Sequence, residues 1–401
     1  MLPTDESLPM KHGHTETREA GATATFSLLG GPLHRLGLRA GLIRPGGSTA
    51  VLGLAIGASL WAVLVVLALV DGIDLTSLTV IGGHVRLLVA IPLLFVAQSI
   101  LDPRLAEFMR GLERAAIVAP ADVPALQAEI ARVTRWKESP LPEALCLLIA
   151  VLMAWLAPSL HIPGTTAAYL SDLHASEVTM TGWWYWTVCL TVFRFLMLRW
   201  LWRLMLWYHC LWRLSRFPLK LIPVHPDRAA GLGYLEVVHM HFAPAVLMIS
   251  VVLAASFAED IAAGRMAVES VVVGFGLILL LDFALFVAPL CLFSAKLWAC
   301  RVKGQSDYMQ LAERYVSDFD GKWVHPRSPA NEPLLGSPDI QSLADLSTAV
   351  DLVRDMRLVP ASLRLLLQIA ITAALPLLPL LLFKYPFTEL LKQGFARLTG
   401  F

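Results

Sequence analysis

The sequence is poor in charge. Charged residues make up 16% of its 401 positions, whereas 57% of the residues are hydrophobic. Soluble globular domains carry about 25% charged residues, so the composition excludes a protein whose whole surface faces water. It indicates an all-α, polytopic α-helical membrane protein whose main partner is the lipid bilayer.

The sequence also has almost no net charge and no cysteine pattern of a known site. The 32 lysines and arginines are balanced by 31 acidic residues. No nucleic-acid partner is expected, because binding to phosphate backbones depends on a surplus of basic side chains. The cysteines form no CxxC pair and lie in or beside apolar runs, so neither a zinc knuckle nor a disulfide framework is indicated. They are Cys146, Cys189, Cys210, Cys291 and Cys300.

Motifs of known chemistry are also lacking. The sequence has no nucleotide-binding loop, nucleophile elbow or HExxH pair, and no histidine-rich box of a membrane di-iron enzyme. His239 and His241 would lie about 200° apart on a helix, which leaves His225 with His239 or His209 as the alternative metal pair. We therefore expect no catalytic residue, metal site or cofactor, and favour a non-enzymatic role over an enzymatic one.

Long apolar runs are what the sequence does contain. A helix needs about 20 residues to cross the roughly 30 Å hydrocarbon core. Helices are expected rather than a barrel because the runs are continuous, and lipid offers no partner to unpaired backbone groups. About seven transmembrane helices are predicted, at residues 49–70, 78–101, 141–160, 182–206, 235–257, 268–294 and 363–383.

Polar segments separate these spans. Residues 1–48 are predicted to be a disordered tail, too long and polar for a secretory signal, with an apolar patch at 26–29 that could touch the membrane. Two segments, 102–140 and 295–362, carry amphipathic helices and predict a small cytoplasmic helical layer. The domain division is thus 1–48, 49–101 (two spans), 102–140, 141–294 (four spans), 295–362, and 363–401 (the last span and a C-terminal tail).

The basic residues predict the orientation. Lysine and arginine tend to stay on the cytoplasmic side, and strongly basic loops alternate along the chain with loops that are nearly free of them. The N-terminus is therefore predicted to be cytoplasmic and the C-terminus to lie outside. Only the C-terminal tail, with Lys384, Lys392 and Arg397, departs from the pattern.

Two charges lie deepest in the predicted spans. Arg194 and Asp282 would be about 18 and 16 Å from the outer face at 1.5 Å per residue. Ionisable groups inside a membrane are candidates for function, and opposite charges at matched depth can pair if their helices adjoin. A static ion pair, a role in conduction or coupling, and snorkelling without contact are the alternatives.

A second candidate is the turn before the fifth predicted span, where the chain re-enters the membrane. Asp227 can accept hydrogen bonds from nearby backbone amides, and Gly231 and Gly233 permit tight backbone. With His225 and Arg228, these residues predict either a rigid turn or a site for a ligand or ion.

Glycines in the first span are spaced for close packing. Gly53 and Gly57 form a small-xxx-small pair that lets helices approach each other. This pair predicts either packing within the molecule or a seam between two copies in a homo-oligomer.

The sequence resembles a family of uncharacterised bacterial multi-pass membrane proteins in three segments, HPDRAAGLGYL at 225–235, DIQSLADL at 339–346 and PLLPL at 376–380. The family often has glycine in place of Ala230 and phenylalanine in place of Tyr234. The resemblance implies a bacterial inner-membrane location and supplies no established activity.

Three functions are compatible with these features. The first is a transporter or channel for a small charged solute or ion, on the basis of Arg194, Asp282 and the proline-interrupted spans. The second is a non-catalytic membrane scaffold or signalling component that acts through its cytoplasmic helices. The third is a membrane-embedded enzyme acting on lipid with the segment around Asp227.

Overall fold

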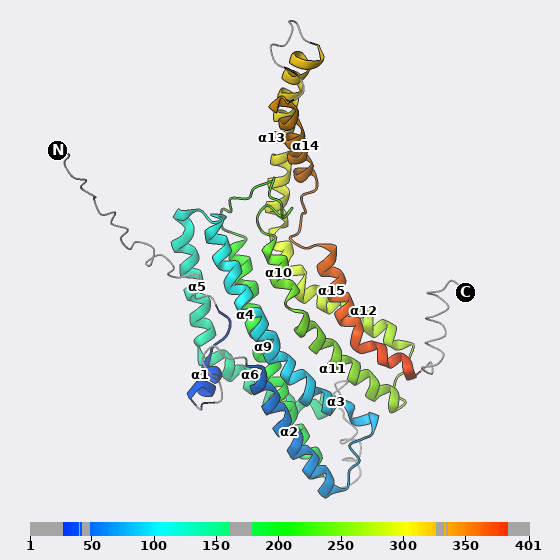
Figure 1. Ribbon diagram of the computed structural model, residues 1–401. Coiled ribbons are helices and arrows are strands. Elements are labelled where there is room, and N and C mark those ends of the chain that lie inside the picture. The colour runs from blue at the N-terminus through cyan, green and yellow to red at the C-terminus, as the bar shows by residue number, and fades with distance from the viewer. Residues whose placement is uncertain are drawn as a thin grey trace, which may run out of the picture.

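The protein is described here by a computed structural model that covers residues 27–39, 41, 49–160, 179–325, 333 and 336–383. These parts of the chain are helical, with no named strand among them. The helices form an elongated bundle from which one long hairpin projects (Figure 1). The all-α fold predicted from the composition is confirmed.

The helices follow one another with short breaks. Three segments, η3, η6 and η8, are π-helical, and η2, η4, η7 and η9 are 3₁₀ helices. The elements are α1 Pro32–Arg39, α2 Ala50–Asp71, η2 Leu78–Val80, α3 Ile81–Val85, η3 Arg86–Ala90, α4 Ile91–Arg114, η4 Pro120–Asp122, α5 Val123–Glu138, α6 Pro140–Leu160, α8 Met180–Trp184, η6 Tyr185–Cys189, α9 Leu190–Leu214, α10 Tyr234–Met240, α11 Ala243–Ala262, α12 Ser270–Phe286, η7 Ala288–Phe293, α13 Ser294–Phe319, η8 Asp320–Val324, α14 Pro338–Arg354, α15 Leu363–Ala374 and η9 Leu375–Phe383.

Several of these helices could cross a membrane. In the described residues, four helices are long and apolar enough, Ala50–Asp71, Ile81–Arg114, Tyr234–Ala262 and Leu363–Leu380, and two helix pairs bent by 44° and 41° raise the number to six if each pair is one span. The chain is thus a multi-pass membrane protein by its apolar helices. The predicted span at 182–206 is helical but is not one of these candidates.

The glycine pair of the first span packs inside the molecule. An added Cβ on Gly53 would lie 2.6 Å from Cδ2 of Phe95, and one on Gly57 would collide with the carbonyl oxygen of Leu87. Both glycines are buried, so α2 can approach η3 and α4 closely. The packing alternative accounts for the spacing, and a homo-oligomer would have to use another surface.

Pro289 interrupts the helix at the C-terminal end of α12. Proline has no N–H, so it leaves the carbonyl oxygen of Leu285 without its helical donor. The Tyr208 hydroxyl donates to that carbonyl, and His239 Nδ1 lies 2.6 Å from the carbonyl oxygen of Phe286. Side chains of α9 and α10 thereby contact the carbonyl oxygens at the end of α12 where the helix is interrupted.

The two amphipathic helices that were predicted to be cytoplasmic do not form one layer. Leu126, Ile130 and Val133 of α5 are buried, and α5 packs along α9. In contrast, α14 packs along α13, and the two form the projecting hairpin, seen in yellow and brown (Figure 1). The layer predicted from sequence is therefore divided between two places.

Segments predicted to be on the same side of the membrane meet at the same end of the bundle. The amide of Lys220 donates to the carbonyl of Ile117 at 2.7 Å, and the amide of Arg357 donates to the carbonyl of Arg228 at 2.8 Å. At the opposite end, the amide of Thr181 donates to the Asp71 carboxylate at 2.8 Å.

Candidate functional site

The turn between α9 and α10 is organised by one carboxylate. Asp227 Oδ1 accepts a hydrogen bond from the amide of Ala229 at 2.8 Å, and Oδ2 accepts from the amide of Gly233 at 2.7 Å. The amide of Gly231 donates to both oxygens, at 3.2 and 3.1 Å. This is the bonding expected of an Asp at the start of a tight turn.

The same turn contains unusual backbone and an acid of lowered pKa. Arg228 and Ala230 have φ values of 55° and 56°, in the left-handed region that side chains with a Cβ avoid. Burial opposes ionisation of Asp227, but its three backbone amides and the charge of His225 outweigh burial and lower its pKa. His225 Nδ1 lies 2.8 Å from Asp227 Oδ1. Both carboxylate oxygens of Asp227 therefore stabilise the turn.

Arg357 connects this turn to the start of α15. Its Nη2 donates to the carbonyl oxygen of Asp227 at 2.8 Å, and its Nη1 donates to Glu236 Oε2 at 2.5 Å. The hydroxyl of Ser362 donates to the other oxygen of Glu236. The turn thus joins α10 to α15 at the root of the α13–α14 hairpin. Among the predicted alternatives, the geometry corresponds to the rigid turn.

Removing the Asp227 carboxylate is expected to destabilise this end of the bundle. Asp227→Ala should lower the free energy of unfolding by roughly 1–3 kcal/mol, because it leaves half-buried amides unsatisfied. Asp227→Asn should cost less, since its amide oxygen still accepts. Denaturation of the purified protein in detergent measures both.

The pH dependence supplies a control. The folded pKa of Asp227 is lowered, so its contribution is complete above the ordinary carboxyl pKa and is lost as the pH falls through the lowered value. Asp227→Asn should lack this component. Equal stability of Asp227→Ala and the parent would show that the carboxylate does not hold the turn.

The predicted ion pair between Arg194 and Asp282 is not formed. Both side chains are buried, at 8% and 0% exposure, yet among the described residues neither the Nη atoms of Arg194 nor the carboxylate oxygens of Asp282 have a hydrogen-bond partner. The guanidinium of Arg194 lies over the ring of Trp186, 5.1 Å from its centroid. α9 packs mainly on α5 and α6, and α12 packs on α15. The two helices meet through Tyr208 with Leu285 and Trp200 with Phe286, and not through Arg194 and Asp282.

A polar cluster joins the two π-helical segments inside the bundle. Arg86, the first residue of η3, donates from Nη1 to the hydroxyl of Tyr185, the first residue of η6, at 2.8 Å. Its Nη2 donates to the hydroxyl of Ser256 at 3.0 Å. Glu259 Oε1 accepts from the amide of Gly82 at 2.8 Å. π-Helical turns are rare and are frequent at functional sites.

The charges of this cluster are close together and shielded from solvent. Arg86 and Glu259 are 5% and 2% exposed. An added Cβ on Gly82 would lie 2.6 Å from Glu259 Oε1 and 2.8 Å from Arg86 Nη1, so both groups converge on this glycine. A side chain there would require Glu259 or Arg86 to move.

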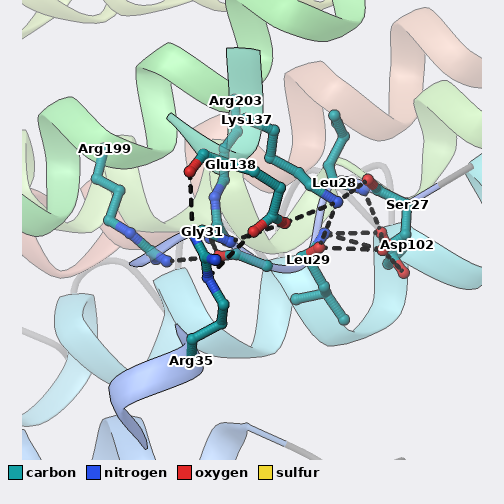
Figure 2. Close-up of polar contacts among 11 residues, drawn as sticks. Ser27, Leu28, Leu29, Gly31, Arg35, Asp102, Lys137, Glu138, Arg199 and Arg203 are labelled. Atoms are coloured by element: carbon teal, nitrogen blue, oxygen red, sulfur yellow. Dashed lines mark hydrogen bonds and ion pairs between the residues drawn. The ribbon is translucent and has the colours of Figure 1, made fainter. Parts of the chain in front are cut away.

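A second charged cluster surrounds the segment that precedes α1. Arg203 and Arg199 each donate from Nη2 to the carbonyl oxygen of Gly30, at 2.6 and 3.1 Å (Figure 2). Lys137 Nζ donates to the carbonyl oxygens of Ser27 and Leu29, at 2.9 Å each. Three basic side chains from α5 and α9 therefore hold one short piece of backbone.

Acidic side chains bind the amides of the same segment. Asp102 Oδ1 accepts from the amides of Leu28 and Leu29 at 2.7 and 3.1 Å, and Glu138 Oε1 accepts from the amide of Gly31 at 3.3 Å (Figure 2). Leu28 is 6% exposed. The predicted tail over 1–48 is thus ordered at residues 27–39, and Leu28 packs in the core rather than on the membrane. The rest of the tail lies outside the described residues, apart from Gly41.

Buried arginines therefore recur along α9. Arg194, Arg199 and Arg203 are all less than 9% exposed, and they follow Tyr185 of η6. From Tyr185 to Arg203 the chain advances about 27 Å at 1.5 Å per residue, close to the thickness of the hydrocarbon core. Arg199 and Arg203 are not among the candidate residues predicted from the sequence. The available signal was their i, i+4 spacing, which puts both on one face of an apolar helix.

No metal site was found. Among the described residues, no group of three or more histidines, cysteines or acids could hold a metal ion. His239, one member of the alternative metal pair, is engaged through Nδ1 with the carbonyl of Phe286.

No family model matches the chain, and neither the curated proteins nor the solved structures include a match. The resemblance to bacterial multi-pass membrane proteins in the 225–235 segment therefore stays a prediction.

Proposed function

We propose that the protein is a transporter or channel for a small anionic solute, and that Arg194 binds this solute inside the membrane. The observation that carries the proposal is the pair of guanidinium nitrogens of Arg194, which are buried and have no hydrogen-bond partner in the described part of the chain. Buried polar groups are nearly always satisfied, so these donors are suited to an anion that comes and goes.

The cost of such a group supports a functional role. A charged side chain at the centre of a membrane costs about 2.5–3.5 kcal/mol on insertion scales. A guanidinium offers a planar fork of donors that matches carboxylates and oxyanions. Thr191, three residues before Arg194, also has a buried hydroxyl without a partner in the described residues. It lies on the same face of α9 and adds a neutral donor.

Arg194 differs from the other buried arginines of α9. Arg199 is held by Glu143 and the Gly30 carbonyl, and Arg203 by Gln98 and the same carbonyl. The Nη donors of Arg194 have no such partner in the described residues, so they are the ones suited to an anion.

The proposed placement in the membrane rests on the basic loops and on the resemblance to bacterial membrane proteins. We assign the protein to a bacterial inner membrane, with seven spans that include the α8–α9 helix, a cytoplasmic N-terminus and an external C-terminus. In this arrangement the Lys220–Ile117 and Arg357–Arg228 contacts lie at the cytoplasmic end and the Asp71–Thr181 contact at the outer end.

Reporter fusions are expected to show this topology. Fusions at Thr165 and Ala262 should read periplasmic, and fusions at Ala121 and Ala330 should read cytoplasmic, because basic loops stay inside. An enzymatic reporter active only outside the cytoplasm, paired with one active only inside it, measures each position. A cytoplasmic signal at Thr165 would reverse the orientation.

Uptake into proteoliposomes tests the proposal itself. The purified protein should take up at least one member of a panel of labelled chloride, nitrate, sulfate, phosphate, acetate and succinate, and unlabelled anion of the same kind should compete. Liposomes without protein are the background. A protein that is folded and moves none of these faster than the background would contradict the proposal.

The projecting hairpin favours a second candidate, a scaffold or signalling component. Leu311, Val316 and Ile340 of the hairpin are 50%, 51% and 42% exposed, and its root is fixed by a hydrogen bond from Arg301 Nη2 to the carbonyl of Arg354 at 2.5 Å. Such apolar side chains could contact a cytoplasmic partner. Deletion of the hairpin tip would abolish partner binding under this alternative and leave anion uptake intact.

A further inference from the structure

The segment from Ser27 to Gly31 is held in the manner of a bound peptide. Its hydrogen bonds to the bundle end on side chains of α4, α5 and α9, and these side chains bind its amides as well as its carbonyl oxygens (Figure 2). The hydroxyl of Ser27 donates to the Asp102 carboxylate at 2.8–2.9 Å. Recognition of both backbone donors and backbone acceptors is typical of a site that binds a peptide through its main chain.

Two glycines are required by the shape of the site. Gly30 has φ +133°, and a Cβ there would lie 2.6 Å from Glu138 Oε1. Gly31 has φ +86°, and a Cβ there would lie 2.6 Å from Glu143 Oε1. Side chains rarely adopt such backbone, so both the conformation and the space select a glycine pair.

The side chains that line the site are themselves fixed. Arg199 Nε donates to Glu143 Oε1 at 2.7 Å, and Arg203 Nη1 donates to Gln98 Oε1 at 2.8 Å. Arg199 and Arg203 are 4% and 5% exposed. A buried set of charged groups that are anchored in this way is pre-organised and needs a partner, because leaving the donors and acceptors empty is costly.

We propose that Asp102, Lys137, Glu138, Arg199 and Arg203 form a binding site for a peptide that bends at a glycine pair, and that Ser27–Gly31 is its tethered occupant. Tethering raises the local concentration of the occupant to the millimolar range, so the site is filled in the intact chain. The assignment does not depend on which solute the protein transports.

Release of the tethered segment tests the proposal in the full-length chain. In Gly31→Ala, hydrogen exchange of the amides of Leu28 and Leu29 should rise at least tenfold. The synthetic peptide acetyl-Phe-Ser-Leu-Leu-Gly-Gly-Pro-amide should then bind saturably, whereas the parent should bind it at least tenfold more weakly. The same peptide with alanine in place of the second glycine should not bind. Gly111→Ala is the matched control, because no atom lies within 4 Å of an added Cβ there, and it should behave like the parent.

Arg203→Gln in the full-length chain is the second variant. It removes the donor to the Gly30 carbonyl, so exchange should rise at Leu28 and Leu29 while peptide binding stays weak, since the site itself is damaged. The proposal is overturned if Gly31→Ala folds and binds no peptide, or if its exchange matches the parent. Should Gly31→Ala not fold, unchanged exchange in Arg203→Gln overturns it equally.

Discussion

Replacing Arg194 by glutamine is expected to abolish most anion uptake and to leave the protein at least as stable as the parent. A hydrogen bond to a charged group is worth about 1.5–3 kcal/mol, and each 1.4 kcal/mol is a factor of ten in affinity. Half-saturation for the transported anion should therefore rise by about tenfold or more. Stability should not fall, because the Nη atoms of Arg194 have no partner in the described residues.

The uptake and the stability of Arg194→Gln together distinguish a functional role of Arg194 from a structural one. Arg194→Lys should keep the charge and lose the planar fork, so its uptake should lie between those of the parent and Arg194→Gln. Arg314→Gln is the control, since Arg314 is exposed on the hairpin. Uptake by Arg194→Gln at the parental rate would contradict the proposed role, and a large loss of stability would indicate that Arg194 holds the fold.

The largest loss of stability is expected at Glu259. Removal of one partner from a buried charged network leaves the other charge uncompensated and costs about 3–5 kcal/mol. Glu259→Ala strands the guanidinium of Arg86 and the amide of Gly82, and should lower the free energy of unfolding in detergent by about that amount. Arg86→Ala should have an effect of similar size.

Asp260 provides a matched control one residue away. Its carboxylate pairs with Arg265 at 2.8 Å in a partly exposed position, and such pairs contribute about 0–1 kcal/mol, so Asp260→Ala should be nearly neutral. The double variant of Arg86 and Glu259 should cost less than the sum of the two single variants. Additive effects in this cycle would show that the two side chains do not interact.

Local features of the fold could be predicted from the sequence. The start of α14 follows from Ser337-Pro338-Asp339, and the structure has Ser337 as the N-cap, accepting from the amide of Asp339. The hydrogen bonds of Asp227 likewise run to amides two to six residues away. Run length and hydropathy are also local properties of the sequence, so they predict most of the apolar helices. The predicted span at 182–206 is likewise helical, as α8, η6 and α9, although it is not among the helices apolar enough to cross a membrane.

Contacts between distant segments could not be predicted. Leu28 and Asp102 are 74 residues apart, and Gly30 and Arg203 are 173 apart, so nothing in the local pattern of the tail indicates its partners. Its polar composition suggested disorder, whereas the burial of Lys137, Arg199 and Arg203 supplies the partners that order it. Similarly, the depths of Arg194 and Asp282 follow from sequence. Which side chains of α9 and α12 meet does not.

The two π-helical turns make the Arg86–Tyr185 contact depend on the exact length of two helices. A π turn holds one residue more than the α-helical turn it replaces, so η3 and η6 each correspond to a single-residue insertion in a different helix. Loss of either residue alone would rotate the preceding part of that helix by about 100° relative to the rest and take one member of the pair away from the other. The lengths of two separate helices are thereby tied together. A single-residue deletion in either helix is therefore expected to break the Arg86–Tyr185 hydrogen bond, whereas a substitution that keeps the length leaves the register of both helices unchanged.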